Sequence, residues 1–488
     1  MKTRTLKQLL LYNYRYIFAY VIIIGFVVYF LGWQLGHIGP GLSAPEISTA
    51  ARHLSFKDIL NLPIYPLHAL LQWVSIQLFG ITIVALRLPS VIIAFLLAVC
   101  LYKLLKKCFG KQTALLCTAI FISADWFLFT ARLATGSIEF SFWLALALLC
   151  FTKLLEHKTQ WLVLFCISLV GLLFAPLGPY AALVLFVSLV SCRVFRQRAE
   201  EANTLTKVAS VLVLAGGVGA IVFFSIQNIA FLKNIFNVTD IPTFSDYFKN
   251  LIFNTSGVVA VLPDANAVIS PSGVFFVRFF ELIFIAFGVA MLWKTRINRL
   301  NLTILILSVV LVLASGLSAG SRGGSILLVP AAIYMTAGVR HFMHRWKRTF
   351  PKNPYARVAA FVPLGLLFIC VVALHYVSYF QLWPNQTATR TVFNHDLVLV
   401  QDELNRPSYK NLDCFVGTND VNLQKLITAS ATVCRVSFTL PATGSSATQI
   451  IQTGAASIPS ESVTRALVSE TEAGNVRWVV VGGNSLAQ

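Results

Sequence analysis

The sequence predicts a polytopic α-helical membrane protein with a small α/β domain at its C-terminal end. Of its 488 residues, 57% are hydrophobic and only 12% are charged, whereas soluble domains have about 45–50% and 25%. The mean hydropathy is +0.76. The apolar residues also gather in runs of the length, about 20 residues, that a helix needs to cross a bilayer. Both observations exclude an ordinary soluble protein.

Eleven apolar runs predict about eleven transmembrane helices. They lie at 15–34, 84–105, 112–130, 137–154, 159–175, 177–195, 206–228, 273–294, 302–318, 324–341 and 357–380. The first run is longer than the apolar part of a signal peptide, and no small-residue cleavage site follows it, so we interpret it as a span.

The distribution of basic residues predicts the orientation. Lys and Arg cluster in the N-terminal segment and in the connections after the second, fourth, sixth, eighth and tenth runs, while the other connections are mostly neutral. Because cytoplasmic loops carry the excess of Lys and Arg, the N-terminus is predicted to be cytoplasmic. The same basic loops account for the net charge of +19, so we expect no nucleic-acid partner. We expect a multi-pass protein of the cell membrane.

The predicted organisation has two parts. Residues 1–380 form the transmembrane domain, with two long outer loops at 35–83 and 229–272, and residues 381–488 form an extracytoplasmic α/β domain. We expect interfacial helices within 60–78 and an amphipathic stretch at 244–253 followed by Leu262-Pro263-Asp264. In the tail, the pattern predicts helices at 397–404 and 421–429, strands at 412–416, 433–440 and 476–481, and a loop at 442–462.

The nine cysteines form no CxxC pair, so the sequence carries no zinc or redox motif of that kind. Cys414 and Cys434 both lie in the predicted outer domain. On the oxidising side of a membrane they could be joined in a disulfide. Two buried thiols are the equally supported alternative, because the sequence does not give their distance.

Ionisable and polar side chains concentrate in the first outer loop. In a chain so poor in ionisable groups, this loop holds His37, Glu46, His53, Asp58, Tyr65 and His68. The three histidines show no metal-ligand spacing, which leaves a divalent metal an open question. The density of polar groups predicts a site at the outer face.

An ordered series of short motifs resembles the GT-C superfamily of membrane glycosyltransferases. The resemblance is to the bacterial branch of protein O-mannosyltransferases and ArnT-like lipid A aminoarabinose transferases, and it covers roughly residues 20–190 well and the later spans by topology. The motifs are Pro45-Glu46-Ile47-Ser48-Thr49-Ala50, Tyr65-Pro66-Leu67, Gly80, Ala85-Leu86-Arg87-Leu88-Pro89-Ser90, Phe109-Gly110, Ala131-Arg132-Leu133-Ala134 and Gly178-Pro179.

The resemblance implies an inverting transfer of one sugar from a polyprenyl-phosphate carrier. The acceptor would be a protein, a lipid or a cell-envelope glycan at the outer face. A carboxylate must take the proton of the attacking hydroxyl, and cations or a metal must balance the leaving phosphate. The expected catalytic base is Glu46, and the expected substrate-binding residues are His53, Tyr65, His68, Arg87, Arg132 and Glu139. We expect Glu46 to line a cavity open to the outer face and to lipid, within reach of Arg132 or Glu139.

Each of these residues also has a structural interpretation. Glu46 could instead be only a negative charge that stabilises the N-terminus of a helix beginning at Pro45. Arg87 could anchor a span at the interface. Arg132 and Glu139 could form a structural ion pair. Asp125 could cap the end of a helix or be solvated there.

The chain departs from the family pattern at four positions. The first acidic residue of the family's pair is replaced by Pro45, two lysines by Ile64 and Leu177, and a further acidic residue by Gly136. These changes leave a catalytically degenerate relative as an alternative. A second alternative is a transporter or flippase of lipid-linked intermediates, which should show inverted repeats or broken helices with ionisable groups at mid-membrane. The sequence shows neither.

Overall fold

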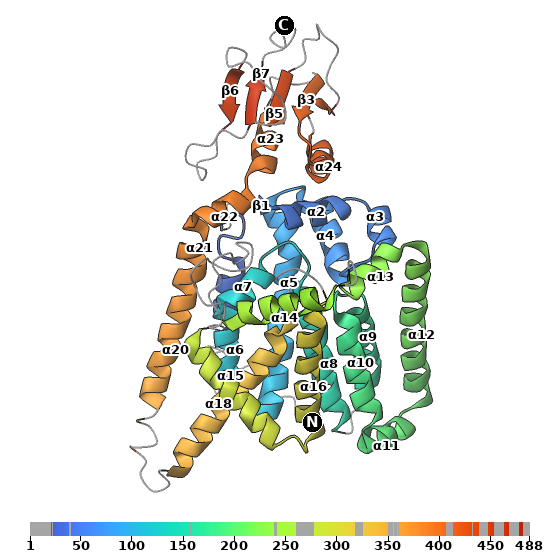
Figure 1. Cartoon of the computed structure of the whole chain (residues 1–488), viewed down its shortest axis with the longest axis vertical. Helices are drawn as coiled ribbons and strands as arrows, with labels where there is room; N and C mark the ends of the chain where they lie inside the picture. Colours follow the sequence, from blue (N-terminus) through green and yellow to red (C-terminus); the bar gives the residue numbers. More distant parts are fainter. Residues whose placement is uncertain are drawn as a thin grey trace, which may run out of the picture.

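The computed structural model has a helical bundle with a small α/β domain above it (Figure 1). The structure describes residues 21, 23–38, 41–156, 159–238, 242–259, 278–317, 326–349, 355, 359, 361–406, 413–431, 433–438, 448–452, 463–467 and 478–481. The Leu262-Pro263-Asp264 segment lies outside these ranges.

The bundle is built almost wholly from helices. After the helix Ile23–Gly32 come α5 (Ile83–Phe109), α6 (Lys111–Ser123), α7 (Asp125–Ala131), α8 (Ile138–Leu154), α9 (Trp161–Leu173), α10 (Gly178–Val190), α11 (Arg193–Glu201), α12 (Thr204–Gln227), α13 (Ile229–Ile235), α14 (Phe244–Val259), α15 (Phe279–Lys294), α16 (Arg299–Ser315), α18 (Leu328–Thr349), α20 (Phe361–Tyr376), the π-helix η1 (Val377–Leu382), α21 (Trp383–Asn385) and α22 (Thr387–Val392).

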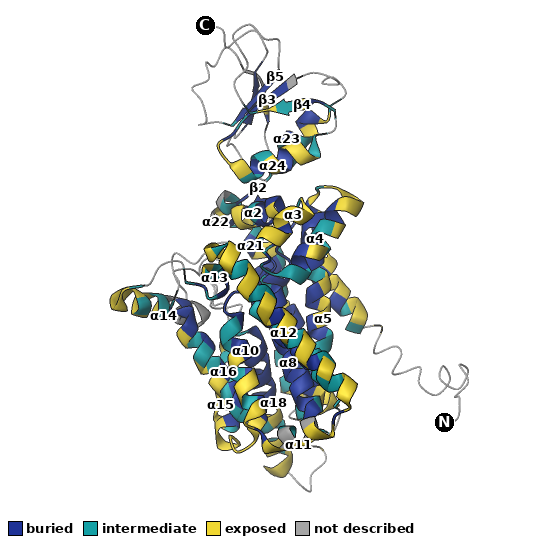
Figure 2. Cartoon of the chain, turned by 90° about the vertical axis from the view of Figure 1, so that its right-hand side faces the viewer, coloured by how far each residue is buried: buried dark blue, intermediate teal, exposed yellow. Residues whose placement is uncertain are grey.

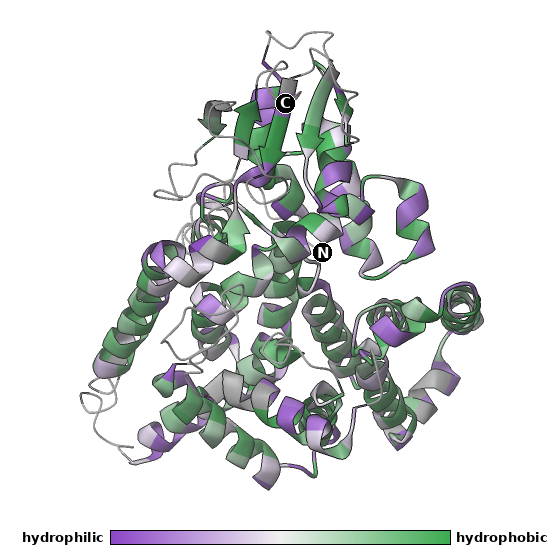
Figure 3. Cartoon of the chain, turned by 45° about the horizontal axis from the view of Figure 1, so that its top comes forward, coloured by the Kyte–Doolittle hydropathy of each residue, from purple (hydrophilic) through white to green (hydrophobic). Residues whose placement is uncertain are grey.

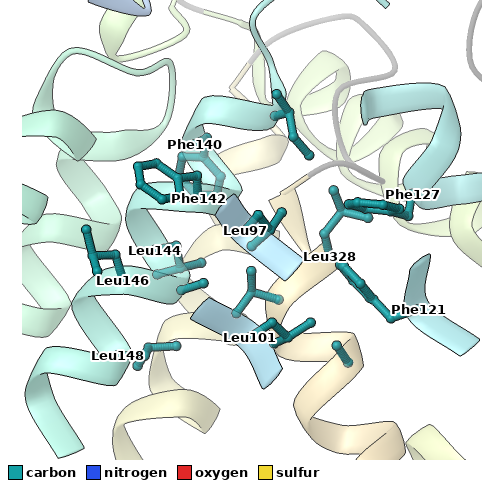
Figure 4. Close-up of a cluster of buried hydrophobic side chains, with 14 of the residues drawn as sticks. Leu97, Leu101, Phe121, Phe127, Phe140, Phe142, Leu144, Leu146, Leu148 and Leu328 are labelled. Atoms are coloured by element: carbon teal, nitrogen blue, oxygen red, sulfur yellow. The ribbon is translucent and has the colours of Figure 1, made fainter. Parts of the chain in front are cut away.

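Helices α5 and α8 form the centre of the bundle. Their leucines and phenylalanines interdigitate with α6, α7 and α18, as Figure 4 shows for Leu97, Leu101, Phe140 and Leu328. Helix α12 is the opposite case, because it leaves side chains such as Leu212 and Phe223 exposed along its length (Figure 2). An apolar face left open in this way is what a lipid environment requires. The ribbons of the bundle helices are coloured mainly as hydrophobic residues (Figure 3).

Each predicted apolar run contains a helix in the described part of the chain. Among the described residues, three helices are long and apolar enough to cross a membrane: Ile83–Phe109, Thr204–Gln227 and Val362–Asn385. The pair α6 and α7, bent by 65°, makes a fourth if it is counted as one span. Four shorter apolar helices are Ile23–Gly32, Trp161–Leu173, Gly178–Val190 and Arg299–Ser315. A membrane fold is therefore supported, while the count of eleven crossings stays a prediction.

The segment predicted to be the first outer loop contains helices, as expected. It contains β1 (Leu42–Ser43), α2 (Ala44–Arg52), α3 (Phe56–Asn61) and α4 (Pro66–Phe79). Strand β1 pairs antiparallel with β2 (Phe393–Asn394), which follows the last long helix. Two segments about 350 residues apart in sequence are thereby joined over the top of the bundle.

The tail forms the predicted α/β domain. Its sheet has the order β4-β3-β5-β7-β6, from strands β3 (Asp413–Gly417), β4 (Arg435–Ser437), β5 (Thr448–Gln452), β6 (Val463–Leu467) and β7 (Trp478–Val481), with helices α23 (Asp396–Leu404) and α24 (Val421–Ser430). Strand β3 is parallel to β4 and β5, and β7 is antiparallel to β5 and β6. Leu423 and Leu426 of α24 share a buried cluster with Ile47 of α2, which seats the domain on the first outer loop.

One prediction for the tail is wrong, and the structure decides between the two alternatives for its cysteines. The predicted loop at 442–462 contains β5, a central strand whose Ile450 and Ile451 are buried; two apolar residues in a polar stretch are too short a local signal for a strand. Cys414 and Cys434 form no disulfide. Cys414 lies opposite Val436 in the sheet, and the Cys434 thiol instead contacts the carbonyl of Leu404.

Candidate functional site

The expected catalytic residue, Glu46, lies in a buried ion pair with Arg87. Glu46 is the third residue of α2, and its side chain is 0% exposed. The Arg87 guanidinium donates from Nε to Oε1 at 2.9 Å and from Nη2 to Oε2 at 3.3 Å. The backbone N–H and the hydroxyl of Ser43 both donate to Oε2 at 3.0 Å, and the N–H of Ala134 donates to Oε1 at 3.0 Å. Both carboxylate oxygens are therefore fully occupied by donors.

Arg87 also joins the two ends of the first loop. Its remaining N–H groups donate to the carbonyls of Leu35, Ile38 and Gly41, at 3.2, 2.9 and 2.7 Å. The chain before α2 is therefore fixed to the start of α5. Burial raises the pKa of Glu46, but the charge of Arg87 and the hydrogen bonds from Arg87, Ser43 and Ala134 outweigh it, so the pKa lies below its usual value and the group stays ionised.

Arg132 and Glu139 do not pair with each other or with Glu46. Arg132 donates to the carbonyls of Phe30 and Trp33, at 2.9 and 2.6 Å, and so satisfies the end of the first helix. Glu139 accepts the N–H of Leu67 and of His68, at 3.2 and 2.7 Å, from the first turn of α4. Among the described residues, the ion-pair partner of Glu46 is thus Arg87, and neither Arg132 nor Glu139 contacts it as expected from the sequence.

His53 and His68 lie together in a buried polar row between α2 and α5. Their ring centres are 5.9 Å apart. His53 Nδ1 lies 2.5 Å from Oε1 of Gln72, whose amide donates to the Leu86 carbonyl. Ser90 lies 3.0 Å from His68 Nε2 and donates its own proton to the Leu133 carbonyl at 2.6 Å. His68 Nε2 must therefore carry the proton that faces Ser90, because Ser90 has none left to give.

That protonation leaves His68 Nδ1 as a buried acceptor. It has no hydrogen-bond partner among the described residues. Burial is the main cause that lowers the pKa of His68 to about 3, with the charge of His53 second, and burial lowers the pKa of His53 to about 4. Both rings are consequently neutral at physiological pH. His37 and Asp58 are exposed and take no part in this row, and Tyr65 is half-buried at the N-terminus of α4.

The positions where the chain departs from the family pattern are packed with apolar groups. Ile64 packs against Phe174, Phe231 and Ile235. Leu177 is 1% exposed in a left-handed backbone conformation, φ 63°. At Gly136, φ is 75°, and an added Cβ would lie 3.0 Å from the Tyr65 ring and 3.2 Å from the His68 ring. An acidic side chain does not fit there without displacing both rings.

Sequence reasoning missed a second buried charge cluster. Asp125, at the bend between α6 and α7, pairs with Arg278 at 2.7 Å and with His375 Nδ1 at 3.1 Å. His375 Nε2 lies 3.2 Å from Glu281, whose other oxygen accepts the indole N–H of Trp126. Asp125 also accepts the hydroxyl of Ser378 in the π-helix at 2.9 Å. Two carboxylates thus face an arginine and a histidine with both ring nitrogens engaged.

This cluster corrects two expectations. Asp125 is 1% exposed and ion-paired, not a solvated cap. The expectation that the chain has no broken helix is also wrong, because α6 and α7 are bent by 65° beside this cluster. The sequence signal was present, since Glu281 and His375 are ionisable residues inside the apolar runs 273–294 and 357–380.

The part of the chain that the structure describes contains no candidate metal-binding site. No group of three or more His, Cys, Asp or Glu side chains there is arranged to hold a metal ion. The buried histidine row contributes two imidazoles, and its other polar members, Gln72 and Ser90, are bonded to backbone carbonyls.

Comparison with known proteins places the fold. Residues 63–235 match the family model described as dolichyl-phosphate-mannose-protein mannosyltransferase. Among solved structures, ArnT from Cupriavidus metallidurans in the apo state is 15% identical, with a TM-score of 0.55 over 98% of this chain and 99% of that chain. The same protein bound to undecaprenyl phosphate is 16% identical, with a TM-score of 0.52 over 95% and 98%.

A further solved structure has a similar fold. The Archaeoglobus fulgidus oligosaccharyltransferase tethered with an acceptor peptide containing the NVT sequon is 14% identical, with a TM-score of 0.50 over 87% of this chain and 64% of that chain. No curated protein sequence matches the chain. The resemblance to the GT-C superfamily is therefore confirmed: the chain has the fold of these membrane glycosyltransferases, and residues 63–235 match the mannosyltransferase family model.

Proposed function

We propose that the chain is a membrane glycosyltransferase that takes a sugar from a polyprenyl-phosphate carrier at the outer face of the membrane. The observation that carries this proposal is the ordered first loop, which holds a carboxylate, Glu46, buried beside Arg87 within the GT-C fold. The undecaprenyl phosphate bound by ArnT, a relative that aligns over nearly the whole chain, supports the class of donor. The acceptor would be a protein, a lipid or a cell-envelope glycan.

The proposal includes a topology. The basic connections support a cytoplasmic N-terminus, about eleven spans over residues 1–380, and outer loops at 35–83 and 229–272. The domain at 381–488 would then lie outside the membrane, above the first loop. Helix α24 packs on α2 through one buried cluster, which agrees with a common side for both.

In this function Glu46 is the proposed base and Arg87 the nearest proposed contact for the donor phosphate. Catalysis then requires substrate to separate the pair, because both oxygens of Glu46 are engaged in the structure. Around the pair, His53, Tyr65, His68, Arg132 and Glu139 would shape the binding site. Arg132 and Glu139 would act as positioning residues, since one holds the first helix and the other the start of α4.

A non-catalytic relative is the second candidate, and a specific observation favours it. Ile64, Gly136 and Leu177 replace family polar residues with apolar packing or with a glycine that no acidic side chain could replace without displacing Tyr65 and His68. An ionised Glu46 with a lowered pKa is also a poor base, because general bases work best with a pKa near the working pH. The chain would then bind a lipid-linked sugar without turning it over.

A transporter of the lipid carrier is the third candidate, supported by the bent α6–α7 pair beside the Asp125 cluster.

One experiment separates the three candidates. Purified protein in liposomes is incubated with labelled polyprenyl-phosphate sugars and candidate acceptors. Release or transfer of label indicates an enzyme. Saturable binding with no release indicates the non-catalytic relative, and movement of intact carrier across the bilayer indicates a transporter. A protein that neither binds nor transfers any donor contradicts the proposed function.

A further inference from the structure

A cavity lies at the end of the bundle opposite to the first loop. Its volume is about 950 Å³, and residues of α5, α8, α15, α16 and α18 line it. Helix α5 begins next to α4 and reaches this cavity with its last turns, so the cavity and the Glu46 site occupy opposite ends of the same helix (Figure 1). The size is at the upper end of the range of small-molecule pockets.

The mouth of this cavity is strongly basic. Lys107, Lys294, Arg340, His341 and His344 line it, against one acidic residue, Glu156. Lys107 is engaged with Glu156, and Arg340 donates to the carbonyl of Cys108. The ammonium of Lys294 and the rings of His341 and His344 have no hydrogen-bond or ion-pair partner among the described residues. The lining therefore offers unneutralised positive charge and free donors.

The interior of the cavity is apolar. Leu104 and Leu105 of α5, Ile304 of α16, and Ile333 and Ala337 of α18 line it, and all five are buried. A ligand that satisfies both parts needs an anionic head and a hydrocarbon chain. An inorganic anion would leave the apolar wall in contact with water, and a neutral lipid would leave the cations unmatched.

We propose that this cavity binds an anionic phospholipid of the adjacent leaflet, with its phosphate at Lys294 and Arg340 and an acyl chain along Ile304 and Ile333. Lysine and arginine are strong phosphate partners. Basic pockets between membrane helices bind anionic head groups on the cytoplasmic side, where anionic lipids are abundant. The proposal is independent of the glycosyltransferase function.

The simpler interpretation is that these cations only set the orientation of the protein. The chain offers a matched test, because Arg345 is an exposed cation on α18 that does not line the cavity, one residue after His344, which does. Orientation depends on both kinds of cation, whereas a binding site depends only on the lining ones.

The experiment uses full-length protein, freed of lipid in a neutral detergent. Phosphatidylglycerol, phosphatidylcholine with the same chains, and inorganic phosphate are added separately. Retained lipid is measured by native mass spectrometry and stability by thermal unfolding. The variants are Lys294→Gln, Ala337→Leu, which fills the apolar wall without a charge change, and Arg345→Gln as control.

We expect phosphatidylglycerol alone to bind and to raise the unfolding temperature. Lys294→Gln should weaken its binding about five-fold, as expected from about 1 kcal/mol for each cation at an anionic surface. Ala337→Leu should weaken it as well, and Arg345→Gln should leave it unchanged. Equal binding of both phospholipids, equal stabilisation by inorganic phosphate, or equal losses in Lys294→Gln and Arg345→Gln would each overturn the proposal. Ala337→Leu keeps the test informative if loss of Lys294 impairs folding.

Discussion

Glu46 and Arg87 form an ion pair 2.9 Å apart between the first turn of α2 and the first turns of α5, with side-chain exposures of 0% and 2%. The two residues are 41 positions apart in the sequence. The remaining N–H groups of the guanidinium donate to the carbonyls of Leu35, Ile38 and Gly41. The same carboxylate also accepts the N–H of Ala134, from the turn before α8. One acidic side chain thus connects three segments that meet at the end of the bundle next to the α/β domain.

The first prediction concerns the stability of this pair. Arg87→Met should destabilise the protein by about 3–5 kcal/mol, because a buried charge is left without its partner. The double variant Glu46→Gln/Arg87→Met should recover part of that loss. Thermal unfolding in detergent measures both. Asp58→Asn, an exposed carboxylate in α3, is the matched control and should have no effect. Additive losses in the double variant would show that the two residues do not interact.

The second prediction concerns Gly136. Gly136→Ala should lower the unfolding temperature, because φ is 75° and the new methyl group would press on Tyr65 and His68. Gly136→Asp should lower the unfolding temperature further and should not raise the activity, although it returns the acidic residue of the family pattern. Gly216→Ala on α12, where nothing lies within 4 Å of the added carbon, is the control and should be neutral or mildly stabilising. A stable, more active Gly136→Asp protein would contradict the packing described here.

The third prediction concerns acid stability. The pKa of His53 is lowered to about 4 and that of His68 to about 3, from the usual 6.5. The unfolded chain therefore binds more protons than the folded chain below pH 6.5, so stability falls as the pH drops from 6.5 towards 3. The double variant His53→Asn/His68→Asn should show a flatter stability profile between pH 6.5 and 4. An unchanged slope in that window would mean that these rings are protonated in the folded protein.

The fourth prediction concerns topology. A reporter that is active only outside the cytoplasm should work when fused after Gln381 and fail after Arg348, because the basic connection following the tenth run is expected in the cytoplasm. The reversed pattern would place the Glu46 site on the cytoplasmic face and remove the proposed outer reaction.

Much of the fold follows from local sequence patterns. Apolar runs predicted helices such as α5 and α12, and β-rich segments predicted β3 and β7, because spans and buried strands each have their own composition. The strand β5 was missed because its two apolar residues become a strand signal only between β3 and β7. A local sequence pattern does not determine the order of the strands in a sheet.

The candidate site was less predictable for a physical reason. Sequence alone identified Glu46, Arg87, Arg132 and Glu139 as unusual, but not their partners. Partners such as Ala134 N–H and the Phe30 carbonyl are backbone groups with no sequence signature. Likewise, the pairing of Asp125 with His375 joins residues 250 positions apart, and only the three-dimensional packing of α6 and α7 against α20 and η1 brings them together.

The most direct test measures transfer of labelled sugar from a polyprenyl-phosphate donor by the wild-type protein and by Glu46→Gln, with Glu46→Gln/Arg87→Gln to remove the unpaired charge. If Glu46 is the base, the wild type should turn over donor, and both variants should lose about 10²–10⁴-fold in rate. Folding, monitored by thermal unfolding, should be retained in the double variant. Unchanged turnover in a folded Glu46→Gln protein, or no turnover by the wild type with any donor and acceptor, would contradict the assignment.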